Sequence, residues 1–259
     1  MGSPMPLRYV EYGRGDAPVI LLHGLFGAPD NWREIMEELA DDYYFFALQF
    51  PIDHSEDRSH QKFTGVEQLT DCVEELVDQL QLDRAIVCGN SLGGQVAVDY
   101  SLRYPDKVDR LIITGSAGLF ERSLSDGKRP QINREIIRQR VNEVFYDERH
   151  CTDQIVDDVH RMLTDRRYVR FLIRVAKATR DRNMKDELDQ LTMPTLIIWG
   201  RDDLITPPFV AEEFQQGIPN ARLVFLDQCG HAPPIEQPRQ FARVMREFLE
   251  ASAPARLPG

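Results

Sequence analysis

The chain has 259 residues, of which 42% are hydrophobic, and this is enough to build the core of one large domain. Its formal net charge of −11 argues against binding to nucleic acid or to anionic lipid, because such binding depends on Lys and Arg that neutralise phosphates. Neither a long apolar run nor a basic and then apolar N-terminal segment is found, so we expect a cytoplasmic protein with no membrane contact.

Short apolar runs rich in Val, Ile and Leu recur along the chain. Side chains alternate between the two faces of a strand. A run that is apolar at both odd and even positions therefore predicts a strand buried on both sides of a parallel sheet. Segments with helical spacing lie between them, as in 66–80. This alternation predicts an α/β fold with a doubly wound, mostly parallel sheet. The predicted strands are 19–22, 45–48, 85–88, 111–114, 195–199 and 223–226.

The segment 53–60 follows the second predicted strand and contains two histidines and three carboxylates. These residue types can ligate a metal ion, but a solvated loop is the interpretation that we prefer. The sequence indicates no cofactor. The four cysteines (Cys72, Cys88, Cys151 and Cys229) are widely spaced and form no C-x-x-C pair, so we expect reduced thiols.

A glycine-flanked serine follows the third predicted strand, in the order Gly89-Asn90-Ser91-Leu92-Gly93, and a helical segment follows it in turn. A sharp turn from strand to helix holds such a serine in a strained backbone conformation, and the glycines leave room for the chain to close. The turn exposes the hydroxyl and directs the free N–H groups of the helix toward it. The alternative is a serine that only caps the helix.

The alternation of strand and helix breaks between residues 118 and 190. Several helix-like segments occur here, with apolar stripes over 132–145 and 155–163, and no strand is apparent. We expect a helical cap at 118–190, inserted into a core domain formed by 1–117 and 191–259.

A serine nucleophile needs a base and a group that orients the base. Asp202 and Asp203 follow the predicted strand 195–199, and His231 follows the strand 223–226. Catalytic groups in open parallel sheets gather at the carboxyl ends of the strands, where Ser91 also lies. The order Ser, Asp, His is the one expected for this arrangement. The alternative for His231 is a histidine that is satisfied within a loop.

These segments resemble the α/β-hydrolase superfamily over nearly the whole chain. The matching motifs are His23-Gly24-Leu25-Phe26-Gly27, Gly89-Asn90-Ser91-Leu92-Gly93-Gly94, Trp199-Gly200-Arg201-Asp202-Asp203 and Cys229-Gly230-His231-Ala232-Pro233-Pro234. The resemblance implies an α/β-hydrolase fold, and it favours Asp203 over Asp202 as the acid, 28 residues before His231. The oxyanion hole is expected at the backbone N–H groups of Leu92 and, by resemblance, Leu25, with Phe26 as the alternative.

The function expected is that of a serine hydrolase acting on a small molecule, with Ser91, Asp203 and His231 as its triad. A carboxylesterase for small to medium acyl esters is preferred, and a carbon–carbon bond hydrolase of dienoic ring-cleavage products is the second choice. Dehalogenase and epoxide hydrolase chemistry is disfavoured, because those relatives carry aspartate in place of Ser91. Perhydrolysis and a non-catalytic receptor on the same fold remain open, and the sequence does not predict the oligomeric state.

Overall fold

The computed structural model describes residues 7–52, 63–120 and 133–251. The segment 53–60, considered above for metal binding, lies outside the described residues, as does Ile132 at the start of the first cap stripe. Within the described residues, no helix is long and apolar enough to span a bilayer.

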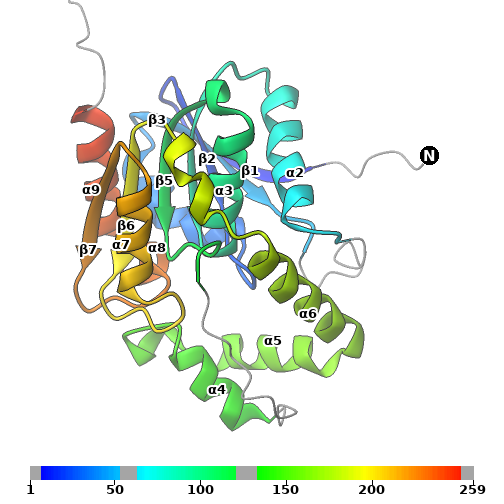
Figure 1. The fold of residues 1–259 in the computed structure, drawn as a ribbon. Helices are drawn as coiled ribbons and strands as arrows, with labels where there is room; N and C mark the ends of the chain where they lie inside the picture. The colour runs from blue at the N-terminus through cyan, green and yellow to red at the C-terminus, as the bar shows by residue number, and fades with distance from the viewer. Residues whose placement is uncertain (1–6, 53–62, 121–132, 252–259) are drawn as a thin grey trace, which may run out of the picture.

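The centre of the molecule is a seven-stranded sheet in the order β1-β3-β2-β4-β5-β6-β7, counted over the described residues (Figure 1). All neighbouring strands run parallel except β1 and β3, which run antiparallel. The predicted mostly parallel sheet is therefore confirmed. The strands are β1 Arg8–Gly13, β2 Ala17–Leu22, β3 Tyr43–Gln49, β4 Ala85–Asn90, β5 Val108–Thr114, β6 Thr195–Gly200 and β7 Ala221–Leu226.

β1 was not predicted from the sequence. This strand lies at the edge of the sheet, and its residues are at most half-buried. The internal strands bury both faces. In β3, Phe45 and Ala47 pack into the core on one side of the sheet, while Phe46 and Leu48 pack into the core on the other. β1 lacks this double burial, and its sequence also lacks a continuous apolar run, whereas β7 at the opposite edge keeps the run 223–226 by which it was predicted.

Helices cover both faces of the sheet (Figure 1). Helices α1 and α9 pack on one face, whose core contains Trp32 and Phe241. Helices α2, α3 and α7 pack on the other, around Tyr100, Trp199 and Phe214. These helices are α1 Arg33–Leu39, α2 Val66–Gln79, α3 Leu92–Arg103, α7 Pro208–Gly217 and α9 Pro238–Ala251, with the short α8 Pro233–Glu236 and the 3₁₀ turns η1 Pro29–Trp32 and η3 Pro105–Lys107.

The inserted region between β5 and β6 is helical where the structure describes it. Helices α4 and α5 lie beyond one end of the sheet, and α6 runs back toward α2 (Figure 1). Ile137, Val141 and Val156 form a small core between α4 and α5 that is separate from the two cores of the sheet. The elements are α4 Arg134–Asn142, η4 Glu148–His150, α5 Asp153–Thr164, α6 Arg166–Asp181 and η5 Lys185–Gln190.

Candidate active site

Ser91 occupies the sharp turn between β4 and α3. Its backbone has φ 56° and ψ −119°, a strained conformation for a residue with a side chain. The strained turn that was predicted here is confirmed. The Ser91 N–H donates to the Thr114 carbonyl at 3.0 Å, and the Ser91 carbonyl accepts from the N–H groups of Gln95 and Ala117, both at 3.1 Å. Three backbone hydrogen bonds therefore hold the turn in place.

The glycines around Ser91 allow close approach of backbone to backbone. A Cβ on Gly89 would overlap the carbonyl of Gly93, and a Cβ on Gly93 would overlap the carbonyl oxygens of Leu22 and His23 at the end of β2. The first turn of α3 thus lies directly against the loop that follows β2.

Replacing Gly93 by alanine is expected to destabilise the protein by at least about 3 kcal/mol, because the clash involves backbone atoms that cannot rotate away. Urea unfolding monitored by circular dichroism measures this loss. Gly65→Ala is the matched control, since a Cβ there would meet only the flexible end of the Glu67 side chain. Equal unfolding midpoints for the two variants would contradict the packing described here.

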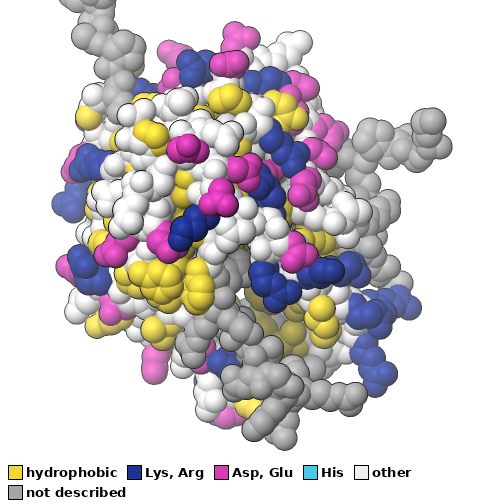
Figure 2. Space-filling model, in the orientation of Figure 1, with side chains coloured by type: hydrophobic (Ala, Val, Ile, Leu, Met, Phe, Trp, Pro, Cys, Tyr) yellow, Lys and Arg dark blue, Asp and Glu magenta, His cyan; other side chains and the backbone are white. Residues whose placement is uncertain are grey.

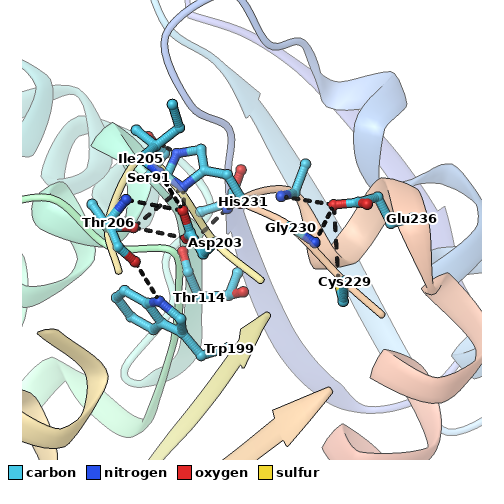
Figure 3. A network of polar contacts seen from close by, with 12 residues as sticks. Ser91, Thr114, Trp199, Asp203, Ile205, Thr206, Cys229, Gly230, His231 and Glu236 are labelled. Carbon is cyan, nitrogen blue, oxygen red and sulfur yellow. Dashed lines mark hydrogen bonds and ion pairs between the residues drawn. The ribbon is translucent and has the colours of Figure 1, made fainter. Parts of the chain in front are cut away.

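A chain of hydrogen bonds joins Ser91, His231 and Asp203 (Figure 3). The Ser91 Oγ lies 2.9 Å from His231 Nε2, and His231 Nδ1 lies 2.9 Å from Asp203 Oδ2. His231 and Asp203 are buried, whereas Ser91 is partly accessible. The nucleophile candidate can therefore meet a substrate while the other two side chains are shielded from water.

The Asp203 carboxylate accepts four hydrogen bonds. Its Oδ1 accepts from the N–H groups of Ile205 and Thr206 at 2.8 and 2.9 Å, and its Oδ2 accepts from the Thr206 hydroxyl and from His231. These donors fix the orientation of the carboxylate and compensate its charge. Asp202, the alternative acid, has an exposed side chain. It is therefore Asp203 that the fold places beside the imidazole.

His23 fixes the loop that follows β2. Its Nε2 accepts the N–H of Phe50 at 3.1 Å, so its proton is on Nδ1, which donates to the Gly24 carbonyl at 2.7 Å. The same carbonyl accepts from the Gly27 N–H. Since the C=O and N–H of a trans peptide point to opposite sides, the Leu25 N–H is turned away from the His23 ring.

This loop lies against the Ser91 turn. A Cβ on Gly24 would lie 3.1 Å from the Ser91 Cβ, so a side chain at position 24 would crowd the serine. Leu25 follows Gly24 directly, and Leu92 begins α3 immediately after Ser91. Gly24 and Ser91 therefore lie in contact. Leu25 and Leu92, the two residues predicted for the oxyanion hole, each directly follow one of them in the chain.

Three polar residues that were not predicted from the sequence also belong to this site. Thr206 lies 3.2 Å from His231 Nδ1 and donates its hydroxyl proton to Asp203. The Asn90 amide donates to the His231 carbonyl at 3.2 Å. Glu236 accepts hydrogen bonds from the loop that carries His231. Only the position of Thr206, three residues after the acid, could have been noticed in the sequence. Asn90 meets His231 through the fold alone, and Glu236 binds backbone N–H groups, which leave no pattern in the sequence.

Several large apolar side chains are exposed, and two of them follow residues of the candidate site directly in the chain. Phe26 follows Leu25 and Leu204 follows Asp203, and about half of each side chain is exposed. The rings of Phe120 and Phe209 lie 5.3 Å apart and are also exposed. Hydrophobic side chains gather on the surface near the lower end of α7 (Figure 2).

Other reactive groups do not form a second site in the described part of the chain. No cluster of three or more His, Cys, Asp or Glu side chains there could hold a metal ion. The four cysteines are unpaired. Burial, with the nearby Glu75 and Asp71, raises the pKa of Cys72 to about 11, and burial also raises the pKa of Cys88. These thiols are poor nucleophiles at neutral pH.

Comparison with known proteins identifies similar chains of similar length. The model of the alpha/beta hydrolase family matches residues 19–244. A 2-hydroxy-6-oxo-2,4-heptadienoate hydrolase of Pseudomonas putida is 29% identical, with 93% of this chain and 91% of that protein covered. A pimeloyl-[acyl-carrier protein] methyl ester esterase of Nitrosomonas europaea is also 29% identical, with 88% and 94% covered.

A solved structure has the same architecture. It is an alpha/beta hydrolase enzyme from the metagenome of sediments from the lagoon of Mar Chica, Morocco, and it is 29% identical with a TM-score of 0.76. The match covers 96% of this chain and 97% of that one. The relatives thus include a methyl ester esterase and a hydrolase of a hydroxy-oxo-dienoate.

Proposed function

The chain belongs to the alpha/beta hydrolase family, and from this we propose that it hydrolyses carboxylic esters with small to medium acyl groups through an acyl-enzyme on Ser91. The observation that carries the proposal is the continuous hydrogen-bond chain from Ser91 Oγ through the His231 imidazole to Asp203. This is the arrangement that activates a serine hydroxyl toward a carbonyl carbon.

In the proposed reaction, Ser91 Oγ attacks the carbonyl carbon of the ester while its proton passes to His231 Nε2. Asp203 holds the proton of His231 Nδ1 and stabilises the imidazolium. Collapse of the tetrahedral intermediate breaks the bond to the alkoxy group, which takes the proton from His231. Water then attacks the acyl-enzyme, with His231 again as the base, and the acid leaves as Ser91 regains its proton.

The oxyanion of the intermediate needs donors at the position where its charge develops. We assign this role to the backbone N–H groups of Leu92 and Leu25. The free N–H groups at the start of α3 and the peptide orientation fixed by His23 support the assignment.

We assign residues 118–190 to a cap over the core domain of 1–117 and 191–259. The separate small core between α4 and α5 and the position of these helices beyond one end of the sheet support this division (Figure 1). The apolar side chains of Phe26 and Leu204 favour a small-molecule substrate with an apolar acyl group over a strongly charged one.

The second candidate is hydrolysis of a carbon–carbon bond in a dienoic diketo acid. The 2-hydroxy-6-oxo-2,4-heptadienoate hydrolase at 29% identity favours it. The same serine chemistry applies, but the leaving group is a carbon that must be protonated. The substrate also brings a carboxylate that the site must accommodate.

The two candidates are separated by a substrate panel. We expect the kcat/KM for an unactivated ester such as ethyl butyrate to exceed that for a dienoic diketo acid by at least about 100-fold. This ratio corresponds to about 2.7 kcal/mol in transition-state binding. Hydrolysis of the ester is followed by pH-stat titration. The dienoic substrate is followed by loss of its visible absorbance. An alkyl ester is needed because p-nitrophenyl esters are activated enough to react in many serine sites.

The reverse ratio would replace the ester proposal by the carbon–carbon one. Acylation of Ser91 in a single turnover, with one equivalent of alcohol released and no later release of the acid, would instead indicate a receptor.

A further inference from the structure

The backbone of His231 is held from two directions. Its N–H donates to the Val144 carbonyl at 2.8 Å, and its carbonyl accepts from the Asn90 side chain. Val144 follows α4 in the inserted helical region, and Asn90 directly precedes Ser91. The backbone that carries the imidazole is therefore held between the turn of Ser91 and the helical insertion.

Glu236 makes a second connection between the same two regions. One carboxylate oxygen accepts from the N–H groups on either side of His231, those of Gly230 at 2.9 Å and Ala232 at 3.4 Å. The other oxygen accepts the N–H of Tyr146, in the insertion, at 2.7 Å. Figure 3 shows Glu236 beside the loop that carries His231 and on the side away from Ser91.

The contact between the two segments leaves no space for a side chain. A Cβ on Gly230 would lie 2.6 Å from the Val144 carbonyl oxygen, 2.9 Å from the Tyr146 nitrogen and 3.0 Å from the Phe145 carbonyl carbon. This packing is independent of the Glu236 hydrogen bonds. The backbone of residues 144–146 therefore rests directly on the loop of His231.

Glu236 is buried, with 6% of its surface exposed. Burial raises the pKa of its carboxyl, while the N–H groups of Tyr146, Gly230 and Ala232, together with the nearby His150, act in the opposite direction. A buried carboxylate held by backbone donors from two segments depends on both segments being in place.

We propose that Glu236 is a positioning residue that joins the loop of His231 to segment 144–146, so that the imidazole is held for proton transfer with Ser91 only while this segment is seated. The proposal rests on the function proposed above. Its consequence is that a displacement of the insertion, as during substrate entry or product release, also releases the base from its catalytic position.

The first test is Glu236→Gln, which keeps the size of the side chain. Its amide group must face the N–H of Tyr146 or those of Gly230 and Ala232, so one connection is lost. We expect kcat to fall by about 10- to 100-fold while KM changes less than about threefold. Glu135→Gln, an exposed residue of α4, is the matched control and should keep wild-type kinetics.

The second test addresses the donor on the insertion. Tyr146→Pro lacks the backbone N–H and Tyr146→Ala keeps it, so the ratio of their kcat values reports the loss of this hydrogen bond together with the space and the fixed φ that the proline ring requires, and the double variant with Glu236→Gln separates the two effects. We expect the proline variant to be slower by at least about tenfold, and its effect to be less than additive with that of Glu236→Gln. Circular dichroism establishes that each variant is folded at the assay temperature.

A fluorophosphonate reagent separates failure of this proposal from failure of the function itself. Its rate of reaction with Ser91 reports activation by His231 without requiring the correct ester. If the wild type is not labelled at Ser91, the proposed function fails. If the wild type is labelled and folded Glu236→Gln is labelled equally fast, the positioning role is overturned. Equal kcat values for the two Tyr146 variants would also overturn it.

Discussion

Ser91→Ala is expected to lower kcat for ester hydrolysis by roughly 10⁶-fold, because it removes the only atom proposed to form the covalent intermediate. The backbone of the turn should persist. Alanine at φ 56° is no more strained than serine, and the three backbone hydrogen bonds of Ser91 do not involve its side chain. Substrate binding should therefore change little, and residual turnover should come from the oxyanion donors and substrate orientation alone.

The measurement combines steady-state kinetics with binding of the acid product by isothermal titration calorimetry. Ser101→Ala is a matched control, since Ser101 is a buried serine of α3 whose hydroxyl donates to the Ala97 carbonyl. We expect wild-type kcat for this control. Wild-type turnover by Ser91→Ala would remove Ser91 from the mechanism, and a loss of product binding would indicate that the turn had rearranged.

The internal strands were predictable from the sequence because each is buried on both faces. This burial leaves a continuous apolar run, as in 195–199, and the observed strands extend the predicted ones by up to three residues. β1 was not predictable in this way, since its partly exposed residues pair only with β3. The inserted region was predicted as helical, and its small core contains Ile137, Val141 and Val156 from the two predicted stripes.

The candidate site was predictable where it consists of residues at strand ends. Ser91, Asp203 and His231 each follow a strand that the sequence predicted, and the parallel sheet brings these ends together. Glu236 could not be found by the same reasoning. Its partners are backbone N–H groups, which leave no pattern in the sequence, and one of them is 90 residues away at Tyr146.

Asp203→Asn is expected to lower kcat by about 10⁴-fold, because it forces the His231 ring into the wrong tautomer. The Asn oxygen should occupy the position of Oδ1, where the N–H groups of Ile205 and Thr206 both need an acceptor. The Asn amide group then faces His231 Nδ1, which must accept its hydrogen bond. The ring proton moves to Nε2, the atom that should receive the proton of Ser91.

The second aspartate provides the control for this argument. Asp202→Asn makes the same chemical change one residue earlier, on an exposed side chain, so we expect kcat within about twofold of the wild type because the protonation of His231 is unaffected. The pH dependence of kcat/KM adds a second measurement, since it reports the base of the free enzyme. If Asp202→Asn is the slow variant, the orienting role passes to Asp202. If both variants are slow by the same factor, a general electrostatic effect of the acidic loop would account for the loss better than the tautomer of His231.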